Sequence, residues 1–129
     1  MKEEKEKYAE FLNYDHKKSV RLGLYASHWN EGDHIVMFIP ALRLSSYGKT
    51  LKEAEYMMWE IVVEAFFNDL FDMKKTDALN TLYNLGWKQN KIFSKKLNHS
   101  EAYVDESGIL QEFNLPKGTK IRQEFVTQA

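Results

Sequence analysis

The segment from Ile35 to Leu70 constrains the fold of this chain more than any other part of the sequence. It opens with an apolar run that ends in Phe38–Leu42, passes through a short polar stretch and reaches Gly48–Thr50. A long amphipathic segment follows. Pro40 cannot donate to a β-ladder and therefore marks the end of a strand. The order of these features predicts a strand, a short further strand and a capped helix.

The predicted helix opens with a capping box, Thr50-Leu51-Lys52-Glu53. The Thr50 hydroxyl can accept from the Glu53 amide, while the Glu53 carboxylate can reach back to the Thr50 amide. We expect the helix to run to about Phe71 with one core stripe at helical spacing. The stripe consists of Leu51, Ala54, Met58, Ile61, Ala65 and Leu70. Further apolar residues widen this stripe, so the helix is expected to need cover beyond one sheet face.

Two strands are predicted before the proline. Apolar and other residues alternate through Ser19–Trp29, and Asn30–Asp33 is typical of a hairpin loop. The returning strand, Ile35–Ile39, is apolar on both faces, so both faces must be covered. We expect the second cover to come from the C-terminal segment, an N-terminal helix or another subunit. A third, shorter strand is predicted at Leu42–Tyr47.

The flanking segments are predicted from shorter patterns. Residues 2–13 are expected to form a charged helix with Tyr8, Phe11 and Leu12 on its apolar side, or else a solvated leader. Asp77–Leu85 is predicted to be a second helix, which Gly86 can terminate in a left-handed conformation. Strand-like pieces follow at Lys91–Ser94, Glu101–Val104, Ile109–Phe113 and Thr119–Val126. The last of these can add a strand to the main sheet.

Composition excludes several classes of protein. The chain has 129 residues, 43% of them hydrophobic, which is enough for one domain with a real core. Its 18 basic and 19 acidic residues lack the basic excess of a free-standing nucleic-acid binder. The absence of cysteine excludes disulfides and thiolate sites. No apolar run reaches the length of a membrane span, and the N-terminus lacks a secretion signal. A cytoplasmic protein without a membrane segment is expected.

No residue pattern predicts a catalytic, cofactor-binding or metal-binding site. The histidines, His16, His28, His34 and His99, do not have a metal-ligand spacing such as HExxH. His28 and His34 flank the hairpin loop beside Asp33, where a weak metal site is conceivable but a solvated hairpin end is favoured. Gly48-Lys49-Thr50 lacks the earlier glycine of a phosphate-binding loop. Glu53, Glu60, Glu64 and Asp69 are expected to line the solvent-facing edge of the long helix.

The unit from Ser19 to Leu70 resembles the HicB antitoxin family. The residues that carry the resemblance are Ile39–Leu42 for the proline segment and Gly48–Ala54 for the start of the helix. The resemblance implies a β-β-β-α core and non-enzymatic binding of a small RNase toxin, HicA, whose active site the antitoxin covers. Many members also carry a C-terminal DNA-binding segment. We find no helix-turn-helix or ribbon-helix-helix pattern after Phe71, so DNA binding is not supported.

Two other functions stay open. Leu79–Trp87, followed by a possible strand and His99, is similar to the opening of the HicA toxin itself. A small RNase or other nucleic-acid-processing protein would then use His99 together with Lys91, Lys95 and Lys96. The third possibility is a structural interaction module without a toxin.

The sequence therefore predicts an α+β protein with a HicB-like antiparallel three-stranded sheet packed by one long helix, and a C-terminal α/β extension. Its predicted parts are an N-terminal charged helix or leader at residues 1–18, the core at 19–71 and the extension at 72–129. The predicted partners are a HicA-like toxin and a second copy of the chain, in a homodimer or higher oligomer. Numerous tyrosines and tryptophans favour such interfaces.

Overall fold

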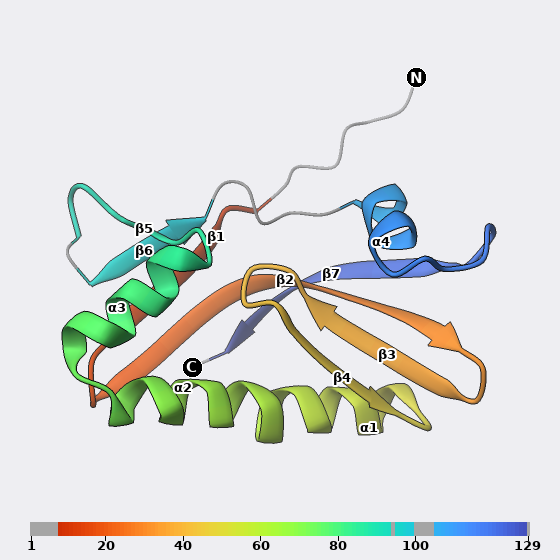
Figure 1. The fold of residues 1–129 in the computed structure, drawn as a ribbon, viewed down its shortest axis with the longest axis horizontal. Helices are drawn as coiled ribbons and strands as arrows, with labels where there is room; N and C mark the ends of the chain where they lie inside the picture. Colours follow the sequence, from red (N-terminus) through yellow and green to blue (C-terminus); the bar gives the residue numbers. More distant parts are fainter. Residues whose placement is uncertain (1–7, 94, 100–104, 129) are drawn as a thin grey trace.

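The computed structural model describes residues 8–93, 95–99 and 105–128, and its fold is α+β (Figure 1). All strand pairings among these residues are antiparallel. The strands are β1 (Glu10–Asp15), β2 (Ser19–Glu31), β3 (His34–Ile39), β4 (Leu44–Gly48), β5 (Lys88–Gln89), β6 (Lys96–His99) and β7 (Ile121–Gln128). The helices are α1 (Leu51–Tyr56), the π-helical turn η1 (Met57–Val62), α2 (Val63–Asp72), α3 (Lys75–Asn84) and α4 (Glu106–Glu112).

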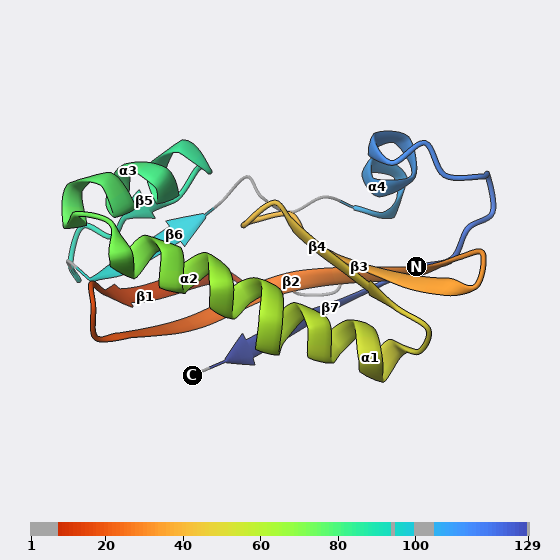
Figure 2. The same cartoon turned by 60° about the horizontal axis from the view of Figure 1, so that its bottom comes forward.

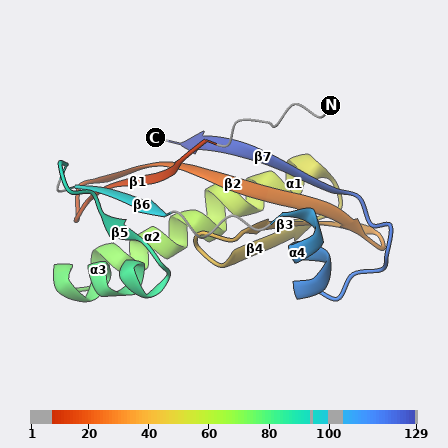
Figure 3. The same ribbon diagram turned by 90° about the horizontal axis from the view of Figure 1, so that it is seen from above.

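Strand β2 is the spine of the sheet. One of its edges pairs with β7 from Leu22 to Trp29 (Figure 3). The opposite edge is shared end to end, because β1 pairs with it at residues 19–23 and β3 at residues 27–31. β4 then extends the sheet beyond β3, while β6 and β5 extend it beyond β1. The central part of β2, around Tyr25, therefore lies in a gap between β1 and β3.

The main core lies on the face of the sheet that carries the even-numbered residues of β2. Helices α1, η1 and α2 run along this face as one continuous rod (Figure 2). Alternate strand residues point into the core because successive side chains of a strand face opposite sides. Helix α3 adds to the same cluster through Ala78 and Leu82. The indole Nε1 of Trp87 donates to the Ala41 carbonyl at 3.0 Å, which ties the end of α3 to the proline segment.

A second, smaller core lies on the opposite face. Ile109 of α4 packs there with Trp29, Phe38 and Ile121. The Phe38 and Phe113 rings lie edge to face with their centroids 4.8 Å apart. Arg43 forms an ion pair with Glu112 of α4 and lies 5.2 Å from the centroid of the Phe38 ring. The C-terminal segment thus covers the second face of β3, so this apolar strand gives no reason to require another subunit.

The long helix begins as predicted. Thr50 is its N-cap, and its hydroxyl accepts from the Glu53 amide at 3.1 Å. The predicted core stripe is partly wrong, because Ile61 and Ala65 are exposed. The reason is η1, in which the Val63 amide bonds the Met58 carbonyl, five residues back. The additional residue in this turn rotates the following helix, so Val63 and Phe67 face the core instead.

Three other predictions are wrong. The N-terminal helix is replaced over residues 10–13 by β1, which buries Leu12 and Tyr14 on one face with the strand period of two; residues 1–7 lie outside the described residues. Ile109–Glu112 belongs to α4, with Phe113 as its C-cap, and the start of this helix is fixed by the Asp105 carboxylate, which accepts from the Gly108 amide at 2.8 Å. Residues 91–93 form no strand, and β5 lies earlier, at Lys88–Gln89.

The sheet has seven strands among the described residues, where three were predicted, and β6 was not among the predicted strands. The other predicted elements lie close to their expected positions. The β2–β3 hairpin turns at Gly32, where φ is +59°. Gly86 ends α3 with φ +103°. β7 joins the main sheet, and β4 starts at Leu44 after a turn in which Arg43 has φ +54°. The strands predicted at Glu101–Val104 and at Ser94 fall outside the described residues. The α+β class is confirmed.

Candidate functional site

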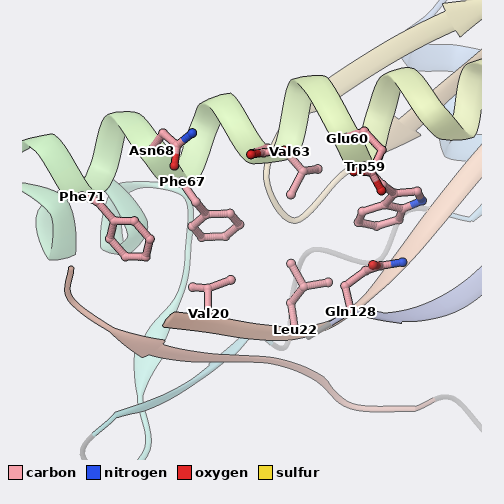
Figure 4. Close-up of a pocket in the computed structure, with 10 residues that line it drawn as sticks. Val20, Leu22, Trp59, Glu60, Val63, Phe67, Asn68, Phe71 and Gln128 are labelled. Carbon is pink, nitrogen blue, oxygen red and sulfur yellow. The ribbon is translucent and has the colours of Figure 1, made fainter. Parts of the chain in front are cut away.

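A groove of about 300 Å³ lies between the long helix and β2 (Figure 4). We call it the α2 groove. Its floor and helix side are lined by Val20, Leu22, Trp59, Val63, Phe67 and Phe71. Its rim is lined by Glu60, Glu64, Asn68 and Gln128. The close-up shows the Phe67 and Trp59 rings pointing from the helix toward β2.

Two features of the fold open this groove. β7 ends at Gln128, opposite Leu22, so no described strand pairs with that edge of β2 at residues 19–21. Val20 consequently remains half-buried although it lies among core residues. The π-helical turn supplies the second feature, because it aims Val63 and Phe67 across the groove. The groove thus lies at the end of a sheet edge, where half-buried Val20 adjoins the buried side chains of Val63 and Phe67.

The rim of the α2 groove is acidic. Glu60, Glu64 and Asn68 follow one another at four-residue spacing, which places them in a row along one side of the helix. Both glutamates are exposed, and no lysine or arginine lines the groove. An apolar floor beside two carboxylates favours a ligand with apolar and cationic side chains on one surface.

Glu10 occupies the gap between β1 and β3. Its side chain is 4% exposed, and its Oε2 accepts from the Tyr25 backbone amide at 3.0 Å. This amide lies between the stretches of β2 that pair with β1 and with β3, so the carboxylate accepts from a donor that neither of these two strands reaches. Burial raises the pKa of Glu10, and the Tyr25 hydrogen bond partly opposes that rise. The geometry assigns Glu10 a structural role.

A second polar link joins the β1–β2 turn to the end of α2. His16 Nε2 lies 3.0 Å from the Met73 carbonyl, and His16 Nδ1 lies 2.7 Å from the Tyr14 hydroxyl. Since a carbonyl can only accept, Nε2 donates to Met73, and in the neutral ring Nδ1 then accepts from the Tyr14 hydroxyl. Burial raises the pKa of the Tyr14 hydroxyl, which keeps this donor protonated. This arrangement fastens the sheet to the helix and leaves no open position for a substrate.

The structure does not bring His99 together with the lysines that an RNase site would use. His99 shares its face of β6 with buried Leu97, where it lies edge to face with Trp87 and its Nε2 is 2.6 Å from the Leu85 carbonyl. Lys96, three residues before His99, points to the opposite face, where its Nζ lies over the Phe11 ring. Lys95 forms an ion pair with Asp15 at 3.2 Å.

The hairpin histidines also stay apart from a metal-binding geometry. Among the described residues, no group of three or more histidine, aspartate or glutamate side chains could hold a metal ion. His34 lies edge to face with Tyr47 of β4. His28 is opposite Met37 and Arg122 in the sheet. The described helices include none with the length and apolar composition that a membrane span requires.

No sequence pattern predicted the α2 groove. Glu60 and Glu64 lie on an exposed edge of the helix, as predicted, but the predicted core stripe included Ile61 and Ala65, which are exposed. The four-residue row of Glu60, Glu64 and Asn68 beside Val63 and Phe67 was the signal that could have located the groove. For Glu10, its alternation with Leu12 and Tyr14 was the available signal.

Comparisons with known proteins add no family. No protein-family model matches the chain, and neither curated proteins nor solved structures include a significant match.

Proposed function

We propose that this chain is a non-enzymatic protein-binding domain of the HicB antitoxin type, and that the α2 groove binds a basic segment of a small RNase toxin. The observation that carries the proposal is the combination of an apolar floor with the carboxylates of Glu60 and Glu64. RNA-cleaving proteins present cationic side chains to the phosphates of their substrate. A surface that binds those cations also blocks access of RNA to them.

The arrangement of the core supports this proposal. A hairpin, a proline turn, a short strand and a Thr50-capped helix occur in the order that the family resemblance implies. The histidines do not favour catalysis, because His16 and His99 each have a ring nitrogen within hydrogen-bonding distance of a backbone carbonyl. Binding rather than chemistry is therefore the better use of the described side chains.

We further propose that a second copy pairs along the outer edge of β7, which no described strand occupies. A twofold axis at position 123 places Arg122 opposite Glu124 of the second copy, and the reverse, on one face of the joined sheet. The other face then pairs Ile121 with Phe125. Shifting the axis by one residue in either direction would oppose like charges, so complementarity selects this register.

Co-purification from the host tests the antitoxin proposal. The chain is produced in its host with an affinity tag, and a protein that co-purifies in a fixed ratio is identified and assayed for RNA cleavage. The proposal predicts a small basic RNase whose activity falls when the chain is added. Glu64→Lys should abolish this inhibition, whereas Asp69→Lys, which makes the same charge change on the same helix outside the groove, should preserve it.

An inhibited RNase that binds the Glu64→Lys chain as tightly as the wild type would show that the groove is not the binding surface. A chain that purifies without any partner in fixed ratio, or whose partner does not cleave RNA, would overturn the antitoxin proposal.

A further inference from the structure

One half of the sheet face opposite the α2 groove has no described helix over it. Helix α4 covers Trp29 and Phe38 at the far end of this face. At the near end, the register of β2, β1 and β6 places Arg21, Asn13 and Lys96 in one row across three strands. The next row contains Gly23, Phe11 and Asn98, and β5 adds Lys88 beside Asn98. We call this area the β1–β6 surface.

The β1–β6 surface is hollowed into a pocket of about 390 Å³. Its lining residues are Phe11, Asn13, Arg21, Phe93, Lys95 and Lys96. Phe93 is 61% exposed, which is unusual for a large aromatic side chain that could otherwise be buried. Gly23 lets the Phe11 and Phe125 rings pack closely over β2, since a Cβ there would clash with Phe11 Cε1 and Phe125 Cζ.

Positive charge surrounds this aromatic floor. Three of the six lining residues are cationic and none is acidic. Of these three cations, Lys95 forms an ion pair, and its partner is Asp15. Lys96 Nζ lies 5.8 Å from the centroid of the Phe11 ring, and Arg21 is exposed with no ion-pair partner among the described residues. The pocket thus retains excess positive charge beside two aromatic rings.

We propose that the β1–β6 surface binds single-stranded nucleic acid. Arg21, Lys95 and Lys96 would contact phosphates, because cations around a groove attract the backbone without regard to sequence. Unstacked bases would lie on Phe93 and Phe11, since every base has a flat face that stacks on an aromatic ring. A duplex hides those faces within its own stack, so the aromatic floor selects single strands.

This site is separate from the α2 groove. Phe11, Asn13 and Arg21 face the side of the sheet opposite Leu12, Val20 and Leu22, because neighbouring strand residues alternate. A partner protein in the α2 groove therefore leaves the β1–β6 surface accessible. The proposal does not depend on the antitoxin proposal and would survive its failure.

Fluorescence anisotropy tests the proposal with the full chain and a labelled 12-nucleotide oligouridylate, repeated with oligothymidylate. We expect binding that weakens as salt rises, and preference for either single strand over a duplex of equal length. Phe93→Ala should weaken binding about 5- to 100-fold, and Lys96→Glu should also weaken it. Tyr47→Ala and Lys117→Glu are matched controls at exposed positions outside the pocket, and both should bind normally.

Several outcomes would overturn the proposal. Absence of binding at micromolar chain concentration and low salt would do so directly. Equal binding of duplex and single strand, or full competition by inorganic polyphosphate at equal charge, would show a surface for polyanions in general. Unchanged affinity in Phe93→Ala would remove the base-stacking role. By contrast, normal RNA binding by Glu64→Lys, with its inhibition of the toxin lost, would support the proposal by showing that the two sites are independent.

Discussion

At the scale of single residues, Glu10 shows how a charged side chain can complete a β-sheet. β1 and β3 share one edge of β2 but do not meet, and the Tyr25 amide lies between them. The Glu10 carboxylate accepts from that amide while it is almost fully buried. The sheet gains a hydrogen bond, but ionisation of a carboxyl in this position is unfavourable because burial removes water from the charge.

We predict that Glu10→Gln stabilises the chain at neutral pH. The amide oxygen can still accept from Tyr25, and no charge is buried. The pKa of Glu10 is raised in the folded state, so the folded chain binds a proton at a pH where the unfolded chain does not. The free energy of unfolding of the wild type therefore rises as pH falls, whereas that of the variant lacks this contribution. Urea unfolding at pH 7.5, 6 and 5 should therefore show a difference that narrows on acidification. A difference that stayed constant or widened would contradict this assignment.

A matched variant separates charge from hydrogen bonding. Glu10→Ala removes the acceptor of the part-buried hydrogen bond from the Tyr25 amide, which should cost about 1–3 kcal/mol. The roles of Gly32, Thr50 and Gly86 could be predicted from the sequence, because each acts through its own backbone or through a residue three positions away. Glu10 was missed because its partner lies fifteen residues away on another strand.

At the scale of elements, the π-helical turn η1 decides which side of the long helix forms the core. Ala54 before this turn and Met58 at its start are buried four residues apart, and after the turn Val63, Phe67 and Leu70 are buried. A uniform α-helix drawn through the sequence places Ile61 and Ala65 on that side. Sequence spacing could predict the existence of the helix and its cap, but not an additional residue within one turn.

We predict opposite outcomes for two truncations on this helix. Ile61→Ala should change the free energy of unfolding by less than about 0.5 kcal/mol, because surface substitutions rarely do more. Phe67→Ala should cost about 3–5 kcal/mol, as expected for a buried aromatic residue. Urea denaturation followed by circular dichroism measures both. Equal costs would mean that the helix continues without the π-helical turn.

Whether the segments outside residues 19–71 form helices or strands depends on their neighbours in the fold, which the sequence pattern does not reveal. Residues 10–13 carry apolar residues that fit either a helix or a strand, and pairing with both β2 and β6 decides for the strand. Ile109 and Phe113 fit a strand by composition, but the Asp105 cap and the apolar surface of Trp29 and Phe38 favour α4. Short apolar runs are ambiguous until their neighbours are known.

At the scale of the whole molecule, self-association along β7 gives a testable stoichiometry. Arg122→Glu and Glu124→Arg should each weaken the proposed dimer roughly tenfold, because each opposes like charges twice across the interface. The double variant restores opposite charges and should recover the dimer. Light scattering after gel filtration measures the mass of each. A wild-type monomer at high micromolar concentration, or a double variant no better than the single variants, would contradict this interface.

The two faces of the sheet carry surfaces of opposite charge. The α2 groove presents carboxylates beside an apolar floor, whereas the β1–β6 surface presents cations beside aromatic rings. A near-neutral net charge of −1 conceals this separation. Composition could therefore exclude disulfides and thiolate sites, but it could not locate either surface, because each draws residues from segments far apart in the chain.

Calorimetric titration of the co-purified toxin into the chain measures directly whether the α2 groove binds a basic partner. We expect saturable binding by the wild type, at least about tenfold weaker binding by Glu64→Lys since like charges would then meet in the groove, and unchanged binding by Asp69→Lys. Equal affinity for all three chains would contradict it.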